Sequence, residues 1–182
     1  IVPINSPLIR ERLNELHHSG YPVVFLTNII EDTRCLSFVG CNYRLSGEVT
    51  AGLLNMLRPQ GGKLLLFSPS FQMYGHTMRA EGLEQQLAAQ YPQITLQHIY
   101  EMTGDDIKDY QITSEALSRF PDTDLFVCPG AYSRGNLLAI REHGYLGRSQ
   151  IICYDYSDEI GAEISNGSIV AAITQCPHCL LY

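Results

Sequence analysis

The chain has 182 residues, of which 45% are hydrophobic, and a formal net charge of −7 at pH 7. This length fits one domain or two small lobes with a filled core. The negative charge argues against binding of a phosphate backbone by this segment, because nonspecific affinity for nucleic acid comes from Lys and Arg that displace counterions. No apolar run approaches the roughly 18 residues that span a bilayer, so we expect no membrane contact.

The first elements are predicted from capping residues and hydrophobic spacing. Ser6 and Pro7 open a helix with an apolar stripe, which ends at Gly20. The unbroken apolar run at 22–26 (PVVFL) predicts a strand buried on both faces. A short strand at 35–40 follows. The next helix carries a predicted apolar face, made of Val49, Leu53 and Met56.

The same alternation continues along the rest of the chain. Strands are predicted at 62–67, 94–100, 124–128, 150–154 and 168–174, with helices at 74–90, 106–120 and 132–144 and a short one that stops at Asn166. Strands separated by helices of this length form right-handed βαβ units. The predicted fold class is α/β, a doubly wound parallel sheet covered by helices on both faces.

Ligands of such sheets bind at the carboxyl ends of the strands. The loops expected there are rich in Tyr, Asn, Asp, Arg and Ser. Hydrogen-bonding and aromatic side chains of this kind favour a small polar organic ligand over a lipid.

The cysteines raise the question of thiol chemistry. Cys176-Pro177-His178-Cys179 resembles the active site of a thioredoxin-like oxidoreductase, but only three residues follow it, and such enzymes need a supporting fold after the motif. A metal site would need a fourth ligand, and no second motif supplies one. We therefore expect a binding protein and not an enzyme, with neither metal nor cofactor. The scattered cysteines favour a reducing cytoplasm.

Other catalytic and cofactor motifs are missing from the sequence. Neither GCNYRLSG nor QGGKLLLF fits a phosphate-binding loop, and no nucleophile elbow is present. The histidines are expected mostly on surfaces. His76 is the exception, because it lies just after the loop that follows a predicted strand.

Two single polar residues have competing interpretations. Arg79, near the start of a predicted helix, is a surface charge or a ligand contact. Asp155 directly follows the strand 150–154, where it either caps the next helix or accepts hydrogen bonds from ligand hydroxyls. Spacing alone leaves both alternatives open.

Four ordered segments resemble the effector-binding domain of LacI-family transcription regulators. They are FVGCNYRLSGEVTAGLLNML, MRAEGLEQQL, PDTDLFVCPGAYSRGNLLAIREHGY and IICYDYSDEIGAEISNGSIVAAITQCP. The resemblance implies a periplasmic-binding-protein fold of two lobes that hold a small molecule between them. Residues 1–43 and 175–182 would belong to the N-terminal lobe, and residues 44–174 would form the C-terminal lobe.

The resemblance also implies ligand-binding positions. On its motifs the ligand contacts fall on Asn42, Arg79, Asp155 and Gln175. Asn42 replaces an acid, Leu83 replaces an aromatic residue, and Pro129-Gly130 replaces an Asn-Asp pair. Aromatic stacking would then come from Phe71, Tyr74 and Tyr132.

The function implied is that of a cytoplasmic, homodimeric regulator that senses a sugar-like effector. Effector binding would shift the population that positions a DNA reader. The helix-turn-helix that contacts DNA would precede this chain, which we expect to be a piece of a longer protein. The alternatives are a sugar-binding protein of an ABC transporter or a sensor ectodomain, and, on Cys176 and Cys179, a thiol oxidoreductase.

Overall fold

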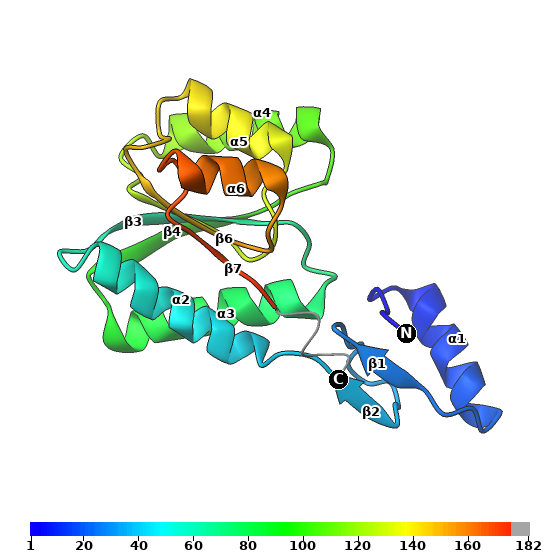
Figure 1. Cartoon of the computed structure of the whole chain (residues 1–182). Helices are drawn as coiled ribbons and strands as arrows, with labels where there is room; N and C mark the ends of the chain where they lie inside the picture. The colour runs from blue at the N-terminus through cyan, green and yellow to red at the C-terminus, as the bar shows by residue number, and fades with distance from the viewer. Residues whose placement is uncertain (176–182) are drawn as a thin grey trace.

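The computed structural model describes residues 1–175 of the chain (Figure 1). In chain order its elements are α1 Pro7–His18, β1 Val24–Leu26, β2 Ser37–Val39, α2 Tyr43–Leu57, β3 Gly62–Ser68, α3 Tyr74–Gln90, β4 Ile94–Glu101, α4 Asp106–Arg119, β5 Leu125–Cys128, α5 Arg134–Glu142, β6 Gln150–Tyr154, α6 Asp158–Ser165 and β7 Ala171–Ile173. The motif Cys176-Pro177-His178-Cys179 lies outside the described residues, as does the rest of the tail to residue 182.

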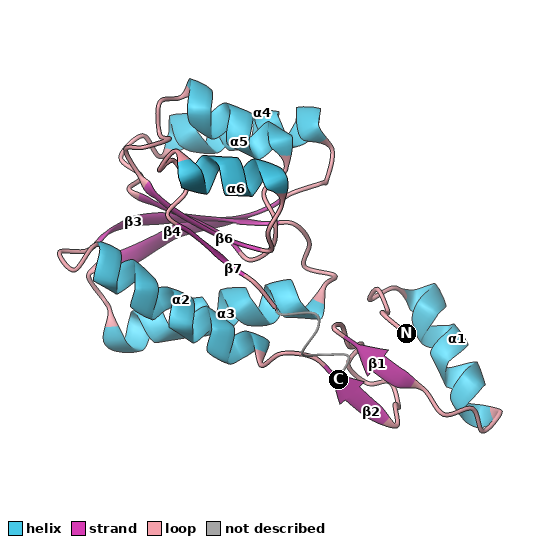
Figure 2. Cartoon of the chain, viewed as in Figure 1, coloured by secondary structure: helices cyan, strands magenta, loops and turns pink. Residues whose placement is uncertain are grey.

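The main sheet has five parallel strands in the order β4-β3-β5-β6-β7. Helices α2 and α3 cover one face, and α4, α5 and α6 cover the other (Figures 1 and 2). The predicted doubly wound α/β class is therefore confirmed. The strand order reverses between β3 and β5, which is where the carboxyl ends of such sheets leave a crevice. We call α2 through β7 the large unit.

Each central strand of the large unit buries both of its faces. On β5, Phe126 and Cys128 pack into the cluster under α4, α5 and α6, while Leu125 and Val127 pack into the cluster under α2 and α3. This two-sided burial explains the nearly continuous apolar strand sequences, because neither face meets water.

Helices α2 and α3 pack very closely through two glycines. A Cβ atom on Gly47 would collide with the carbonyl oxygen of Arg79, and one on Gly82 would collide with that of Arg44. This contact fixes the place of α3, and with it the place of Arg79. The predicted apolar face of α2 is wrong for Val49 and Met56, which are exposed, whereas Leu53 packs against the cluster under α2 and α3. The face that meets α3 is the one with Gly47.

The second sheet pairs β1 with β2 in parallel, and α1 packs beside it. We call these three elements the small unit. Its core consists of Leu13, Val23, Phe25 and Ile30. The predicted strand at 22–26 begins only at Val24, and Val24 is 41% exposed, so burial on both faces is wrong. One helix covers one face of this sheet within residues 1–175.

A buried amide joins the two units. The side chain of Asn28, which follows β1, accepts a hydrogen bond from the backbone N–H of Tyr74 at 2.6 Å and donates one to the carbonyl of Pro3. Asn28 thus ties the end of β1 to the start of α3. None of the helices in the described part of the chain has the length and apolarity needed to cross a membrane.

Candidate functional site

A cleft of about 440 Å³ lies where the two units meet. Its walls come from the carboxyl ends of β6 and β7, the first turns of α2 and α3, and Thr27 directly after β1. The cleft lies at the carboxyl ends of the strands, as ligand sites of parallel sheets do, although its strand-end residues follow β6 and β7 and not β5. Three of the predicted site residues, Arg79, Asp155 and Gln175, line it together.

Arg79 is a buried cation without an acidic partner among residues 1–175. Its side chain is 3% exposed, and one Nη donates to the carbonyl oxygen of Pro129 at 2.6 Å. The guanidinium carbon lies 4.1 Å from the ring centroid of Tyr154 and 5.0 Å from that of Tyr43. Aromatic faces stabilise a desolvated guanidinium. The Nε atom has no hydrogen-bond partner in the described chain but is itself fully buried, so the donor left for a ligand is the second Nη, which forms no hydrogen bond within residues 1–175.

Tyr154 is itself held rigidly beneath the cleft. Its hydroxyl donates to the backbone carbonyl of Ser46 at 2.8 Å and lies 2.5 Å from the hydroxyl oxygen of Thr50. These bonds to α2 fix the ring on which Arg79 rests. The direction of the guanidinium is therefore set before any ligand arrives, which lowers the entropic cost of binding.

Asp155 faces the cleft and does not cap α6. Ser157 is the N-cap residue, and its hydroxyl accepts from the backbone N–H of Ile160. The Oδ1 of Asp155 instead accepts from the side-chain amide of Gln175 at 2.9 Å. The sequence left open whether Asp155 caps the next helix or faces a ligand. The geometry favours the second alternative, and Gln175 orients the carboxylate.

Two residues with left-handed backbone flank the cleft. Thr27 has φ of 58° and Asp155 has φ of 62°, and each directly follows a strand. Non-glycine residues adopt this conformation rarely, and such positions gather at functional sites. The hydroxyl of Tyr43 donates to the carbonyl of Thr27 at 2.6 Å, so the small unit and the large unit are joined at the cleft as well.

The charges in the cleft balance. Burial is the main cause that lowers the pKa of His76, so its imidazole is neutral near pH 7. Burial likewise raises the pKa of Tyr43, which keeps its hydroxyl protonated. The remaining charges among the described lining residues are one cation, Arg79, and one anion, Asp155. An uncharged polar ligand matches this arrangement.

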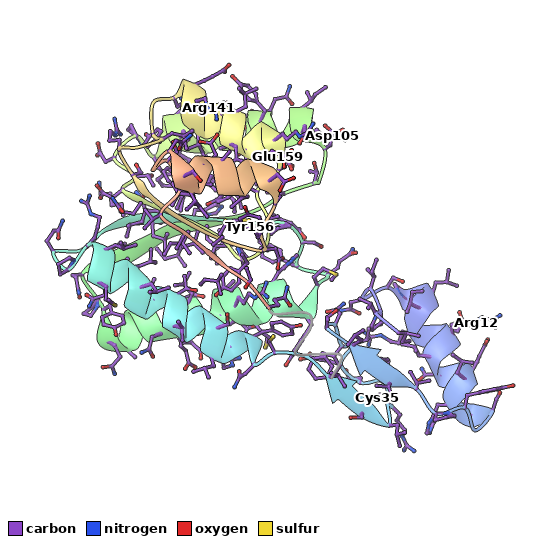
Figure 3. All side chains as sticks on the ribbon, viewed as in Figure 1. Arg12, Cys35, Asp105, Arg141, Tyr156 and Glu159 are labelled. Carbon is purple, nitrogen blue, oxygen red and sulfur yellow. The ribbon has the colours of Figure 1, made fainter. Side chains whose placement is uncertain are left out.

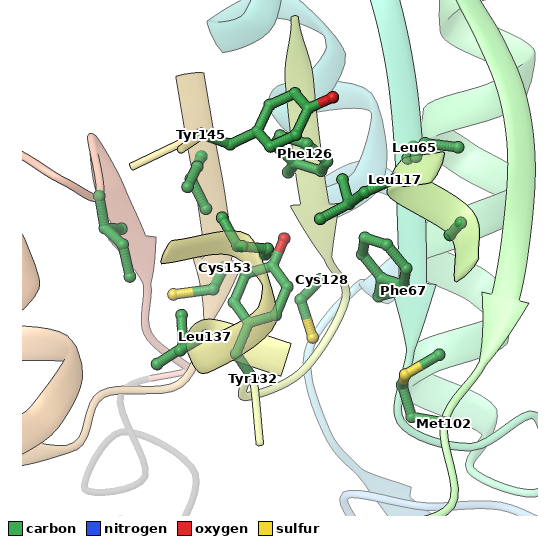
Figure 4. Close-up of a cluster of buried hydrophobic side chains, with 14 of the residues drawn as sticks. Leu65, Phe67, Met102, Leu117, Phe126, Cys128, Tyr132, Leu137, Tyr145 and Cys153 are labelled. Atoms are coloured by element: carbon green, nitrogen blue, oxygen red, sulfur yellow. The ribbon is translucent and has the colours of Figure 1, made fainter. Parts of the chain in front are cut away.

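Four predicted residues are not brought to this cleft. Asn42 is exposed and caps α2, where its side chain accepts from the backbone N–H of Leu45 at 3.0 Å. Phe71 and Tyr74 line a separate hollow of about 140 Å³. Tyr132 is buried in the core beside Cys128 and Cys153 (Figure 4).

The aromatic and polar side chains that do line the cleft were mostly missed from the sequence. They are Tyr43, Tyr156, Thr27 and Thr174, together with His76, whose position after a strand had marked it. Tyr43 is the neighbour of the predicted Asn42 and the first buried residue of α2. This position is the feature of the sequence from which Tyr43 could have been predicted as a site residue. Tyr156 follows Asp155 and is 62% exposed, so nothing in its spacing distinguishes it from a surface residue.

Fold and cleft together define a two-unit ligand-binding protein with its site between the units. Residues 1–180 match the periplasmic binding protein domain family, and the chain belongs to that family. None of the curated protein sequences matches this chain.

Several solved structures share the fold. GanP, a glucose-galactose binding protein from Geobacillus stearothermophilus, superposes with a TM-score of 0.88 at 18% identity, over 98% of this chain and 64% of its own. The Caulobacter myo-inositol binding protein gives 0.86 at 20% identity, over 99% and 62%. An ABC transporter solute binding protein from Agrobacterium vitis, bound with alpha-D-tagatopyranose, gives 0.78 at 18% identity, over 88% and 57%. The chain spans less than two thirds of the length of each.

Proposed function

We propose that the cleft binds a neutral polyhydroxylated molecule, a sugar or a cyclitol. The observation that carries this proposal is the pairing of Arg79 with Asp155. A guanidinium whose second Nη has no partner within residues 1–175 supplies a donor, and a carboxylate held by Gln175 supplies an acceptor. Neighbouring hydroxyls can accept from the first and donate to the second, and bonds to charged groups are the stronger ones.

The balanced charge of the cleft supports a neutral ligand over an anionic one. An anion would pair with Arg79 but would also face the carboxylate of Asp155, which lines the same cleft. The rings of Tyr43 and Tyr156 give the apolar surface that the C–H face of a sugar requires.

We further propose that the parent molecule is a solute-binding protein of a sugar transporter or the ectodomain of a sugar sensor. The support is the family and the likeness to GanP and to the myo-inositol binding protein, whose names state what they bind. In this proposal residues 1–43 and Gln175 belong to one lobe and residues 44–174 to the other, and ligand binding shifts the equilibrium toward a closed arrangement.

A LacI-type regulator is the second candidate, favoured by the four ordered sequence segments. Within residues 1–175, Cys35, Cys41, Cys128 and Cys153 form no disulfide with one another, which suits a cytoplasmic protein. In this candidate the protein is a homodimer, and a helix-turn-helix outside this chain contacts DNA. The codons upstream of this segment discriminate the two candidates: a helix-turn-helix indicates the regulator, and a signal peptide indicates the solute-binding protein.

Calorimetric titration of the intact protein tests the proposed ligand class. The probes are D-glucose, D-galactose, L-arabinose, D-xylose and myo-inositol. For the probe that binds, Arg79→Met or Asp155→Asn should weaken the binding free energy by about 2 kcal/mol or more, because each leaves polar groups of the complex unpaired.

The exposed residues Arg119 and Asp122 provide matched controls, as Arg119→Met and Asp122→Asn, and both should leave the affinity unchanged. Circular dichroism checks that each variant folds. Unchanged affinity in both cleft variants would contradict the site, and the absence of binding by every probe would contradict the ligand class.

A further inference from the structure

His76 occupies a space that the chain leaves open in the wall of the cleft. It lies in the first turn of α3 and faces Gly130, in the loop after β5. A Cβ atom built on Gly130 would lie 2.9 Å from Nε2 of His76 and 2.8 Å from Cγ of Pro69. The imidazole thus fills the volume that a side chain at position 130 would need. Pro129 and Gly130 themselves offer no polar side chain there.

The hydrogen bond of the other ring nitrogen fixes the tautomer of His76. Nδ1 lies 3.1 Å from the carbonyl oxygen of Ser70. A carbonyl only accepts, so Nδ1 carries the proton and donates. In a neutral imidazole Nε2 is then a bare acceptor. No group within residues 1–175 forms a hydrogen bond with Nε2.

The surroundings of His76 keep the imidazole neutral. Burial is the largest cause that lowers its pKa below 6.5, and the nearby cation of Arg79 lowers it further. The carbonyl of Ser70 and the carboxylate of Asp155 act in the opposite direction and are weaker in sum. Tyr43, on the facing helix α2, stays protonated and uncharged because burial raises its pKa.

His76 and Arg79 lie three residues apart on α3, so they are neighbours on one face of the helix, and both line the cleft. His76 offers a hydrogen-bond acceptor, and Arg79 offers a donor. We propose that His76 is a specificity-determining ligand contact: its Nε2 accepts a hydrogen bond from a ligand hydroxyl next to the hydroxyl whose oxygen accepts from Arg79. This inference rests on the proposed function and selects, within that class, ligands with two adjacent free hydroxyls.

The contact makes ligand binding depend on pH in one direction. The bound state requires the neutral imidazole, and a bound hydroxyl donor lowers the pKa of His76 further. Affinity should therefore be constant above pH 6.5, where free His76 is neutral, and should fall below the lowered pKa of the free protein, with one proton released for each ligand bound.

The test uses the intact protein and the five probes named above, with calorimetry from pH 8 to pH 5 in buffers of different ionisation enthalpy. His76→Leu should weaken binding at pH 8 by about five- to tenfold, the loss of one hydrogen bond, and should abolish the pH dependence. His76→Gln, whose amide oxygen accepts at every pH, should stay within about threefold of the wild type and also lose the pH dependence. The exposed His143→Leu is the matched control and should keep both the affinity and the pH profile.

The outcomes separate this inference from the proposed function. If no probe binds the wild type, the proposed function fails and the role of His76 fails with it. If a probe binds in a manner that requires Arg79, yet His76→Leu binds as tightly as the wild type at pH 8, the role of His76 alone is overturned. Should His76→Leu fail to fold, His76→Gln still decides through the pH profile.

Discussion

Within residues 1–175, buried side chains are divided unequally between the two sheets. The large unit holds clusters of 15 and 11 buried hydrophobic residues, one on each face of its sheet, whereas the small unit holds four. Because burial of apolar area is the main stabilising contribution, the large unit is stable through its own core. The small unit depends in part on its ties to the large unit, through Asn28 and Tyr43.

This contrast in core size indicates that the two walls of the cleft differ in rigidity. Arg79, Asp155 and His76 belong to the large unit, and so the polar contacts lie on a rigid wall. Thr27, on the opposite wall, belongs to the small unit. A site with one rigid wall and one compliant wall can hold its hydrogen-bonding groups in place while the other side adjusts to the ligand.

The largest difference that we expect between the two units is in the rate at which their cysteines react with a thiol label. Cys35 lies in the small unit (Figure 3) and is partly exposed, whereas Cys153 is fully buried and burial raises its pKa to about 12. At pH 8 we expect maleimide to modify Cys35 on the order of a thousandfold faster than Cys153, since the thiolate is the reactive form. Peptide mass spectrometry follows each thiol of the intact chain separately. Similar rates at the two positions would contradict the contrast.

Phe126→Ala tests the core of the large unit. Phe126 is fully buried on the central strand β5, stacked on Phe67 at 6.3 Å between ring centroids and edge-on to Tyr145 at 5.4 Å. Truncation should lower the free energy of unfolding by about 4 kcal/mol through lost burial and a residual cavity. Urea denaturation measures it. The control is Phe71→Ala, at an exposed position, which should cost less than about 1 kcal/mol.

Phe25→Ala tests the small unit in the same way. Phe25 is also fully buried, but in a core of four residues. We expect a loss of about 3 kcal/mol that stays local, because the large unit does not need this core. Amide hydrogen exchange should show reduced protection in β1 and β2 with unchanged protection in β5. An equal loss of protection in β5 would mean that the two units unfold together.

The same contrast explains how much of the fold could be predicted. In the large unit the apolar strands and helix signals agree, and the bounds of α3 and β6 match the prediction residue for residue. In the small unit the run at 22–26 indicated two buried faces, but Val24 is exposed. An apolar sequence indicates only that a face of a strand can be buried. Whether that face is buried depends on which elements pack against it.

The polar part of the site was predicted from the resemblance and not from spacing, which left the roles of Arg79 and Asp155 open. Arg79, Asp155 and Gln175, placed on the motifs of the resembling family, line one cleft in the structure. The aromatic residues were not predictable, because their directions depend on neighbours distant in sequence. Tyr132 packs in the core beside Cys128, while Tyr43 lines the cleft and its hydroxyl donates to the carbonyl of Thr27.

Tyr43→Phe should have the smallest effect and gives the closest test of the tie between the units. The substitution keeps the ring, which lies 5.0 Å from the guanidinium of Arg79, and removes only the hydroxyl that donates to Thr27. The free energy of opening of the amides in β1 and β2 should fall by about 1 kcal/mol, the net value of one hydrogen bond. Hydrogen exchange measures it, with Tyr21→Phe, an exposed hydroxyl of the small unit, as the control.

The size of this effect relative to Phe25→Ala decides what holds the small unit in place. A smaller loss for Tyr43→Phe is expected because the bonds of Asn28 remain as a second tie and the core of Phe25 is intact. A loss in Tyr43→Phe as large as in Phe25→Ala would show instead that contact with the large unit outweighs the core of the small unit. In that case the wall that carries Thr27 would move only when the hydrogen bond to Tyr43 breaks, and ligand entry would be governed by that bond.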